Sequence, residues 1–209
     1  MARFKQDFDT VRRTSRRTFE APLHWKEPRR IFTCSWSDFF HHGADAWREE
    51  AWEIIKATPQ HTYQILTKRP GLMVDWANKH GWPNQIWAGT SVESQKYAPR
   101  LDVLARVPAK IRFVSVEPML EAVELYPYFF KCSGCGQVPC ACKGLTIHQV
   151  IVGGESGRGF RPMDIEWLKA IEAECDHAGV ALFVKQDSGQ FPGKQGRIPD
   201  RLWARKEMP

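Results

Sequence analysis

The sequence predicts an α/β fold: a partial or closed parallel βα barrel of the TIM type, with about six βα units and a small cysteine-rich insertion. Six short β-type runs lie about 25 to 36 residues apart, a spacing typical of successive βα units rather than hairpins. Apolar runs such as QVIV and ALFV are typical of parallel strands buried on both faces. Polar or charged residues follow almost every run. In a barrel such residues converge on one mouth, whereas a doubly wound sheet gathers them near one switch point, so we favour the barrel.

The six strands are expected in runs that end in polar or charged residues, at 29–38, 61–70, 84–94, 109–118, 147–157 and 179–189. Amphipathic helices are expected between them. The helix at 44–58 has Asp45 as its expected N-cap. Its predicted apolar face consists of Trp47, Ala51, Ile54 and Ile55.

Two later helices have clear ends. Pro70 begins the first of them and Gly81 ends it, whereas Asp164 begins the second and Gly179 ends it. The predicted apolar faces are Leu72, Met73 and Trp76 in the first helix, and Leu168, Ile171 and Cys175 in the second. Residues 95–107 predict a weaker helix, because Pro99 interrupts it.

Charge divides the chain into three parts. The net charge is +6, but residues 1–30 hold nine Lys/Arg against four Asp/Glu and residues 194–209 hold five against two. We expect a basic N-terminal arm at 1–30, a βα barrel domain at 31–193 with the cysteine-rich insertion at 131–144, and a basic C-terminal tail at 194–209. Basic ends favour contact with nucleic-acid phosphates, although Arg-rich ends also serve solubility alone.

The apolar pattern bears on localisation. No apolar run approaches the ~20 residues that span a bilayer, and the first ten residues have no signal-peptide core. We therefore expect a cytoplasmic protein without a membrane partner. In that compartment thiols are free or bound to metal rather than paired in disulfides.

Four of the six cysteines lie in the insertion, at Cys132, Cys135, Cys140 and Cys142. Four thiolates this close are typical of a tetrahedral structural Zn²⁺ site, and an iron–sulfur cluster or the absence of metal are the alternatives. A four-thiolate zinc site has no open position, so it would hold a loop together rather than catalyse a reaction.

A glycine-rich turn follows the fifth predicted strand. Gly153, Gly154, Glu155 and Ser156 predict a backbone nest that binds an anion, with Glu155 available to a ligand amine or ribose hydroxyl. The stretch matches neither a P-loop nor GxGxxG. The alternative is a tight turn that leads to the helix at Asp164.

Other strand ends supply further candidate ligand-binding residues, namely Lys68, Thr90, Ser115, Glu117 and Lys185. Lys68 and Arg69 suit a phosphate or a carboxylate. Opposite charges around one mouth are equally consistent with a satisfied salt-bridge network. Cys34 is expected inside a strand, buried and without an activating base, and a solvated His41–His42 pair is favoured over a metal site.

Five stretches of the sequence carry a family resemblance: RTFEAPLHWKEPRRIFTCSWSDFFH, HTYQILTKRP, IWAGTSVESQ, RFVSVEPML and VIVGGESGRGFRPMDIEWLKAIEAECDHAGVALFVKQ. In this order they resemble successive blocks of the phage gene-product thirty-seven/sixty-eight family. That family is uncharacterised, is associated with phages and also occurs in bacterial genomes. The likeness covers nearly the whole chain.

Full-length members of this family resemble radical S-adenosylmethionine proteins. The resemblance implies a partial βα barrel and three cysteines near the start that hold a [4Fe–4S] cluster, which binds and cleaves S-adenosylmethionine. This chain matches the family downstream of those cysteines, and the Cys132–Cys142 spacing does not replace them. A truncated protein without radical activity is therefore expected. The resemblance further implies that Thr90, Ser115, Glu117 and Lys185 surround the cofactor and that Glu155 holds its amine.

Three functions follow as hypotheses. The first is a radical-S-adenosylmethionine-like protein that modifies a nucleic acid or a nucleotide, inactive as this chain. The second is a non-enzymatic nucleic-acid-binding protein with basic ends and a structural zinc loop. The third is a hydrolase or lyase that uses the charged mouth alone.

Overall fold

The six predicted strands form one parallel sheet. The structure, a computed structural model, describes residues 11–35, 37–130 and 144–209. The strands are β1 Arg30–Phe32, β2 Thr62–Thr67, β3 Ile86–Ser91, β4 Arg112–Val116, β5 Gln149–Gly153 and β6 Ala181–Gln186. They pair in chain order, and every pair is parallel. The cysteines predicted to bind zinc, at 132, 135, 140 and 142, lie outside the described residues.

Helices lie between successive strands, and others precede β1 and follow β6. The α-helices are α1 Arg16–Phe19, α2 Asp45–Ala57, α3 Pro70–His80, α4 Arg100–Leu104, α5 Tyr126–Phe129, α6 Ile165–Ala178 and α7 Asp200–Trp203. The 3₁₀ helices are η1 Ala21–His24, η2 His42–Ala44 and η3 Gln95–Tyr97. Within the described residues no helix has the length and apolar character needed to cross a membrane.

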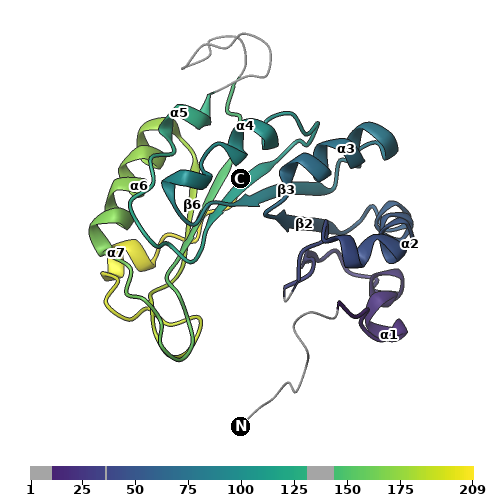
Figure 1. The fold of residues 1–209 in the computed structure, drawn as a ribbon, viewed down its shortest axis with the longest axis horizontal. Helices are drawn as coiled ribbons and strands as arrows, with labels where there is room; N and C mark the ends of the chain where they lie inside the picture. The colour runs from purple at the N-terminus through teal and green to yellow at the C-terminus, as the bar shows by residue number, and fades with distance from the viewer. Residues whose placement is uncertain (1–10, 36, 131–143) are drawn as a thin grey trace.

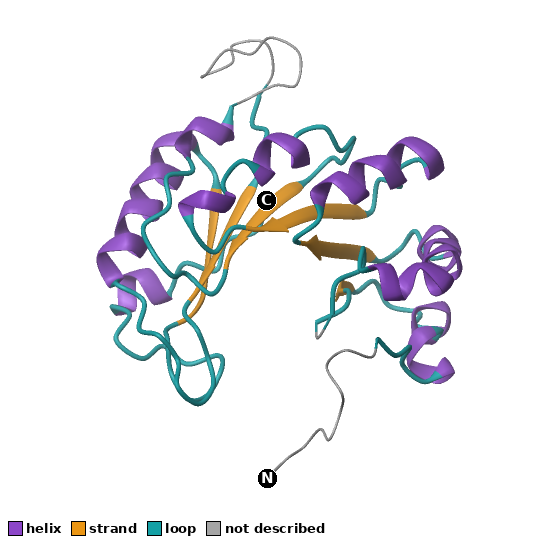
Figure 2. Cartoon of the chain, in the orientation of Figure 1, coloured by secondary structure: helices purple, strands orange, loops and turns teal. Residues whose placement is uncertain are grey.

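The sheet is curled into a half-barrel with the helices on its convex side (Figures 1 and 2). In the described part of the chain β1 and β6 are the two ends of the strand order, so the barrel is partial rather than closed. The sequence predicted a partial or closed parallel βα barrel, and the structure confirms the parallel βα barrel in its partial form. One core lies between the sheet and the helices, and its fully buried members include Ile65 of β2, Val114 of β4 and Leu182 of β6.

Alternation along the strands assigns the remaining side chains to the concave face, because neighbours in a strand point to opposite faces. The large apolar side chains on that face are Phe32, Leu66, Trp87, Phe113, Ile151 and Phe183. None of these six belongs to the helix-side core. Phe113 is nevertheless fully buried, and a Cβ at Gly89 would lie 2.2 Å from its Cζ, so its ring covers that glycine.

The predicted limits of α6 are confirmed. The Asp164 side chain accepts a hydrogen bond of 2.9 Å from the Glu166 amide, and Gly179 ends the helix with φ +68°. An N-cap carboxylate satisfies a helix amide that has no partner within the helix, and only glycine adopts a left-handed end without strain. Leu168, Ile171 and Cys175 are fully buried, as predicted.

Removal of this cap is expected to have a moderate effect. Asp164→Ala should lower the free energy of unfolding by about 1 kcal/mol, measured by urea denaturation, because the Glu166 amide loses its acceptor. Asp164→Asn keeps a side-chain acceptor and should lie within a few tenths of a kcal/mol of the wild type. Equal losses in both variants would contradict a role for the cap.

Residues 194–209, predicted as a basic tail, are instead a folded part of the barrel. The Val184 amide donates to the Arg205 carbonyl at 2.9 Å, and the Glu207 amide donates to the Leu182 carbonyl at 3.0 Å, which adds an antiparallel segment to β6. Leu202 is buried. Hydrogen bonds to an exposed strand edge and burial of apolar side chains hold these residues on the sheet despite their charge.

The described part of the N-terminal arm also lies on the barrel. The Pro22 carbonyl is 3.1 Å from Nε2 of the fully buried His61, and Arg13 forms an ion pair with Glu50 of α2. Arg16 pairs with Glu20 within the arm itself. Two basic residues of the arm that was expected to contact phosphates, Arg13 and Arg16, are therefore already paired with carboxylates.

Three single-residue predictions in the first βα unit are wrong. Asp45, expected as the N-cap of α2, is instead the first residue of that helix. Trp52, rather than Trp47, is the fully buried tryptophan of α2. The two side chains lie about 140° apart around the helix, and Trp52 is the one that packs against Trp76 and Trp82. Cys34 is not buried within a strand: it is exposed, beyond the end of β1, with φ 57°.

Candidate ligand-binding mouth

Polar side chains from three strands meet on the concave face at the carboxyl edge of the sheet. We call this group, which consists of Ser91, Glu93, Ser115, Glu117 and Lys185, the mouth. Ser91 of β3 is in register with Ser115 of β4, so their side chains share the concave face side by side. Both residues are at most 5% exposed. The two hydroxyls form a polar floor to the mouth.

Glu117 and Lys185 form an ion pair that spans one strand. Nζ of Lys185, in β6, lies 2.8 Å from Oε2 of Glu117, which directly follows β4. The strand between them, β5, ends at Gly153, where a Cβ would lie 3.0 Å from Cδ of Glu117. The glycine therefore makes room for the carboxylate. The Lys185 side chain is 49% exposed and that of Glu117 20%, so both charges are accessible to a ligand.

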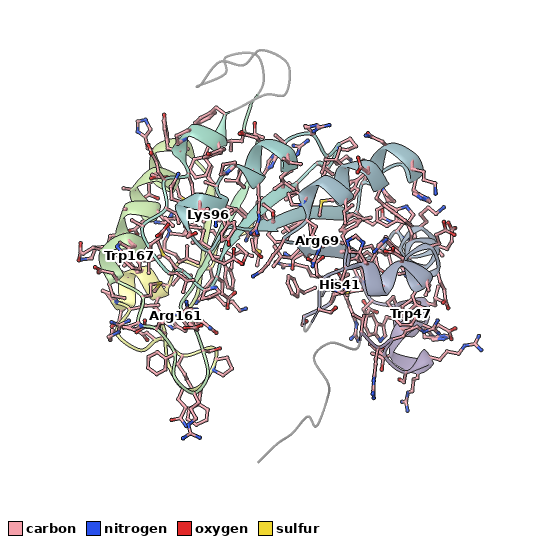
Figure 3. The ribbon with its side chains drawn as sticks, in the orientation of Figure 1. His41, Trp47, Arg69, Lys96, Arg161 and Trp167 are labelled. Carbon is pink, nitrogen blue, oxygen red and sulfur yellow. The ribbon has the colours of Figure 1, made fainter. Side chains whose placement is uncertain are left out.

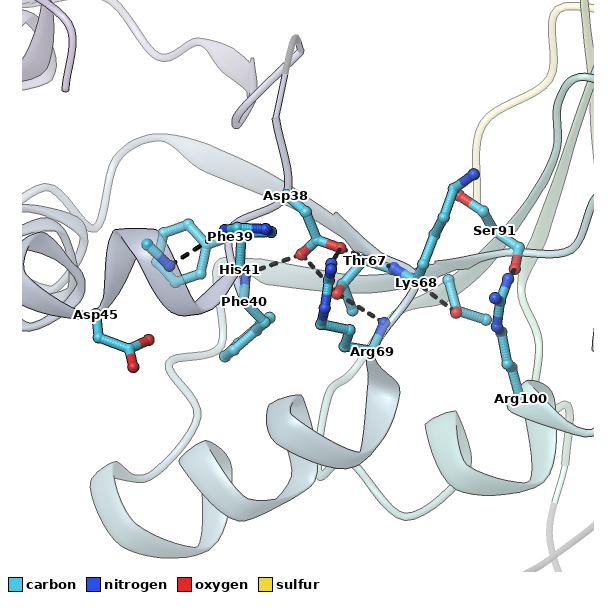
Figure 4. Close-up of polar contacts among 12 residues, drawn as sticks. Asp38, Phe39, Phe40, His41, Asp45, Thr67, Lys68, Arg69, Ser91 and Arg100 are labelled. Carbon is cyan, nitrogen blue, oxygen red and sulfur yellow. Dashed lines mark hydrogen bonds and ion pairs between the residues drawn. The ribbon is translucent and has the colours of Figure 1, made fainter. Parts of the chain in front are cut away.

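Glu93 holds two cations at the β3 end of the mouth. Lys68 forms an ion pair with one carboxylate oxygen, and Nη1 of Arg100 lies 3.0 Å from the other. Arg100 also donates to the Ser91 carbonyl at 2.8 Å (Figure 4). Burial raises the pKa of Glu93, but the hydrogen bond from Lys68 and the charges of both cations outweigh it, so the net pKa is below its usual value. Lys68 is thus engaged by the protein itself.

Asp38 fastens the loop after β1 to the end of β2. Its carboxylate accepts hydrogen bonds from Oγ1 of Thr67 at 2.7 Å, from the Lys68 amide at 3.1 Å and from Nη1 of Arg69 at 2.8 Å (Figure 4). The Phe40 amide adds a fourth bond at 2.9 Å. Arg69 and His41 both lie at the end of the sheet formed by β1 and β2 (Figure 3). Arg69, predicted to bind phosphate or carboxylate, is occupied by this carboxylate.

The predicted nest at 153–156 lies against the chain itself, and the Gly154 amide donates to the Gln186 carbonyl at 3.0 Å. A Cβ at Gly154 would lie 2.2 Å from the Ser188 amide nitrogen, so this glycine accommodates the backbone that follows β6. Glu155 is held by Arg161, with Nη2 to Oε1 at 2.7 Å and Nε to Oε2 at 2.8 Å. The hydrogen bonds from the Arg161 side chain and amide lower the pKa of Glu155 to about 2.

The structure brings together only some of the predicted ligand-binding residues. Glu117 and Lys185 meet beside Gly153, Ser115 lies on the same face of the sheet next to Ser91, and Lys68 joins the mouth through Glu93. Thr90 is fully buried and donates to the Thr67 carbonyl, so it supports the sheet. Gly154, Glu155 and Ser156 belong to a separate projection beside β6, where Ser156 forms a bridge with Gly189.

The ion pair between Asp187 and Arg197 was not predicted from the sequence. Asp187 has a side chain only 2% exposed, and it accepts hydrogen bonds from Nη2 of Arg197 at 2.7 Å and from Nε at 2.9 Å. A carboxylate just after β6 is a signal in the sequence, whereas no local pattern indicates that an arginine ten residues later is its partner.

Metal-binding side chains are dispersed. Among residues 11–35, 37–130 and 144–209, no three His, Cys, Asp or Glu residues form a group that suits a metal ion. The two described cysteines are the exposed Cys34 and the buried Cys175, whose pKa burial raises strongly. Nδ1 of His41 accepts a hydrogen bond from the Gly43 amide at 3.1 Å, which gives His41 a structural role in its turn.

Comparison with known proteins identifies a family. A family model described as "Protein of unknown function (DUF5131)" matches residues 1–203. No curated protein and no solved structure matches the chain. The matched range includes all six strands and every residue of the mouth.

Proposed function

The chain belongs to the DUF5131 family, and we propose that it is a radical-S-adenosylmethionine-like barrel protein of a type that modifies a nucleic acid or a nucleotide, without radical activity as this chain, and that it binds S-adenosylmethionine at the mouth. One observation carries the cofactor part of this proposal: the Glu117–Lys185 ion pair over Gly153. The open parallel half-barrel supports it, because ligands of such sheets bind at the carboxyl ends of the strands.

The ion pair has the chemistry that an amino-acid zwitterion needs. The methionyl part of S-adenosylmethionine has an ammonium and a carboxylate on one carbon atom. Glu117 would accept hydrogen bonds from the ammonium, and Lys185 would donate to the carboxylate, so each ligand charge replaces one partner of the existing pair. Charge-assisted hydrogen bonds are about twice as strong as neutral ones, and here they would form over a buried floor.

The other residues of the mouth position these two groups. Ser91 and Ser115 offer hydroxyls that donate or accept as a ligand requires. Glu93, held by Lys68 and Arg100, keeps its negative charge and fixes the β3 side of the mouth. When bound, S-adenosylmethionine supplies an activated carbon–sulfur bond. The described residues provide no ligand set for a [4Fe–4S] cluster, so they do not fit that group.

The binding test uses isothermal titration calorimetry of the full chain with S-adenosylmethionine. Glu117→Gln and Lys185→Met are each expected to raise Kd at least about tenfold, which corresponds to about 1.4 kcal/mol, because each removes one charged contact. The matched control is Lys169→Met, which removes an exposed ion pair with Glu166 on α6 and should leave Kd unchanged.

A second ligand separates the zwitterion from the nucleoside. 5′-Methylthioadenosine lacks the amino-acid group, so its affinity should be the same for the wild type, Glu117→Gln and Lys185→Met. Absence of S-adenosylmethionine binding to the wild type, or equal Kd values for all variants, would refute the cofactor proposal.

A further inference from the structure

The loops after β5 and β6 form one projection that the mouth does not use. Backbone hydrogen bonds join the two loops. The Gly157 amide donates to the Gly189 carbonyl at 3.0 Å, and the Gly189 amide donates to the Glu155 carbonyl at 3.0 Å. We call residues 155–162 and 188–197 the paired loops. They project together from the sheet as neighbouring green and yellow segments (Figure 1), and Arg161 is labelled on them in Figure 3.

The base of the paired loops is held firmly. The Met163 amide donates to Oγ of Ser188 at 2.8 Å, and Arg197 donates to both carboxylate oxygens of the buried Asp187. Nη2 of Arg197 also donates to the Met163 carbonyl at 2.8 Å, which ties the second loop to the first. The projection is therefore a preorganised surface, and binding to it costs little ordering entropy.

Each loop presents one exposed phenylalanine. Phe160 is 39% exposed and Phe191 is 62% exposed, the latter being the most exposed large apolar side chain in the described part of the chain. Apolar aromatic surface that is exposed to water has an unfavourable free energy, and stacking of a flat ligand on the ring would bury that surface. Two such rings on adjoining loops favour a ligand with more than one flat face.

The surroundings of the two rings are positively charged. The paired loops contain four Lys/Arg residues and one glutamate. Glu155 is neutralised by Arg161, whose side chain remains 62% exposed. Arg158 and Lys194 are exposed, and no described carboxylate pairs with either of them. The cations therefore suit a polyanion, and exposed cations next to exposed aromatic rings are the combination that binds unpaired nucleic-acid strands.

We propose that the paired loops bind single-stranded nucleic acid, with bases stacked on Phe160 and Phe191 and phosphates held by Arg158 and Lys194. Base–aromatic stacking tolerates any sequence, because every base has a flat face. A duplex hides these faces, so the loops should discriminate against it. The inference rests on the proposed function in that nucleic acid is the substrate. It places that substrate beside the mouth, because the paired loops follow the strands that carry Gly153 and Lys185.

The test is fluorescence anisotropy with a fluorescein-labelled twelve-nucleotide oligo(dT) and the full chain. Phe160→Ala combined with Phe191→Ala is expected to raise Kd at least about tenfold, and a mixed-sequence duplex of equal length should bind at least about tenfold more weakly than the single strand. Arg158→Gln combined with Lys194→Gln should weaken binding and reduce the slope of log K against log salt by about 0.7 for each cation.

The matched control removes two cations that lie outside the paired loops. Arg12→Gln combined with Arg17→Gln removes two exposed charges of the N-terminal arm and should leave the affinity within about twofold. Circular dichroism at increasing temperature should show the same Tm for all variants, since the exchanged side chains are exposed. Binding that is lost in the arm variant and retained in the loop variants would overturn the assignment. The absence of oligo(dT) binding would also overturn it and would favour a protein as the partner of the exposed rings. Equal affinity for the duplex and the single strand would overturn it as well.

The two proposals fail separately. The paired-loop variants should bind S-adenosylmethionine with the wild-type Kd, because the mouth is intact in them. Oligo(dT) binding without S-adenosylmethionine binding would refute the cofactor site and support the paired loops, and the reverse result would refute the paired loops alone.

Discussion

Gly154→Ala is expected to lower the free energy of unfolding by about 3 kcal/mol, the upper part of the range for overpacked interiors. A Cβ at this position would lie 2.2 Å from the Ser188 amide nitrogen and 2.7 Å from the Asp187 carbonyl carbon. Both atoms belong to backbone, so no side chain can turn away to relieve the contact. The loop after β6 would have to move, and with it the base of the paired loops. Urea denaturation measures the loss.

Gly71→Ala is the matched control for this substitution. Gly71 lies in the first turn of α3, and a Cβ there meets no atom within 4 Å. Alanine also restricts the unfolded chain, so this variant should be as stable as the wild type or more stable by up to about 1 kcal/mol. A stable Gly154→Ala variant that no longer binds S-adenosylmethionine would show instead that the glycine serves ligand approach, as the sequence first indicates.

Arg197→Ala is expected to lower the free energy of unfolding by about 2 to 3 kcal/mol. The Asp187 carboxylate is almost completely buried, and without Arg197 it keeps only the backbone amides of Ser188 and residue 197 as donors. Breaking a buried ion pair costs about 3 to 5 kcal/mol, and the half-exposed Arg197 side chain reduces that figure. Arg197→Lys should recover only part of the loss, because an ammonium cannot donate to both oxygens in the geometry of a guanidinium.

The same ion pair predicts a dependence of stability on pH. Burial raises the pKa of Asp187, but hydrogen bonds from Arg197 and the Ser188 amide outweigh it, so the pKa in the folded protein lies below the ordinary value of 3.8. The stabilisation is therefore fully present above about pH 4 and is lost as the pH falls below that value. Asp187→Asn should show a smaller loss of stability between pH 5 and pH 3 than the wild type. Parallel pH profiles would show that Asp187 does not contribute.

Local patterns determined the architecture of the barrel. Apolar β-type runs predicted all six strands, because burial on both faces requires apolar side chains along the strand. Capping residues predicted the ends of α6, because cap geometry depends on a few adjacent residues. Pro99 correctly predicted a weak helix near 95–107, where the structure has the 3₁₀ turn Gln95–Tyr97 and the short α4.

The composition of the mouth was only partly predictable. Strand-end position identified Ser115, Glu117 and Lys185, since carboxyl ends of parallel strands share one edge. The same rule wrongly grouped Thr90 with them, because a strand-end residue points to either face and alternation turns this one towards the helices. Register between strands, rather than position along the chain, decides which hydroxyls face a ligand.

The sequence by itself determined which segments become strands and helices, and that the strands run parallel in a partial or closed barrel. Only the tertiary structure decided which charges remain free for a ligand. Arg69, Arg161 and Arg197 have the same local character as Arg158 and Lys194, yet the first three are held by carboxylates that the fold brings to them. The physical reason is that secondary structure depends mainly on neighbouring residues, whereas an ion pair depends on two charged groups that come together only when the chain folds.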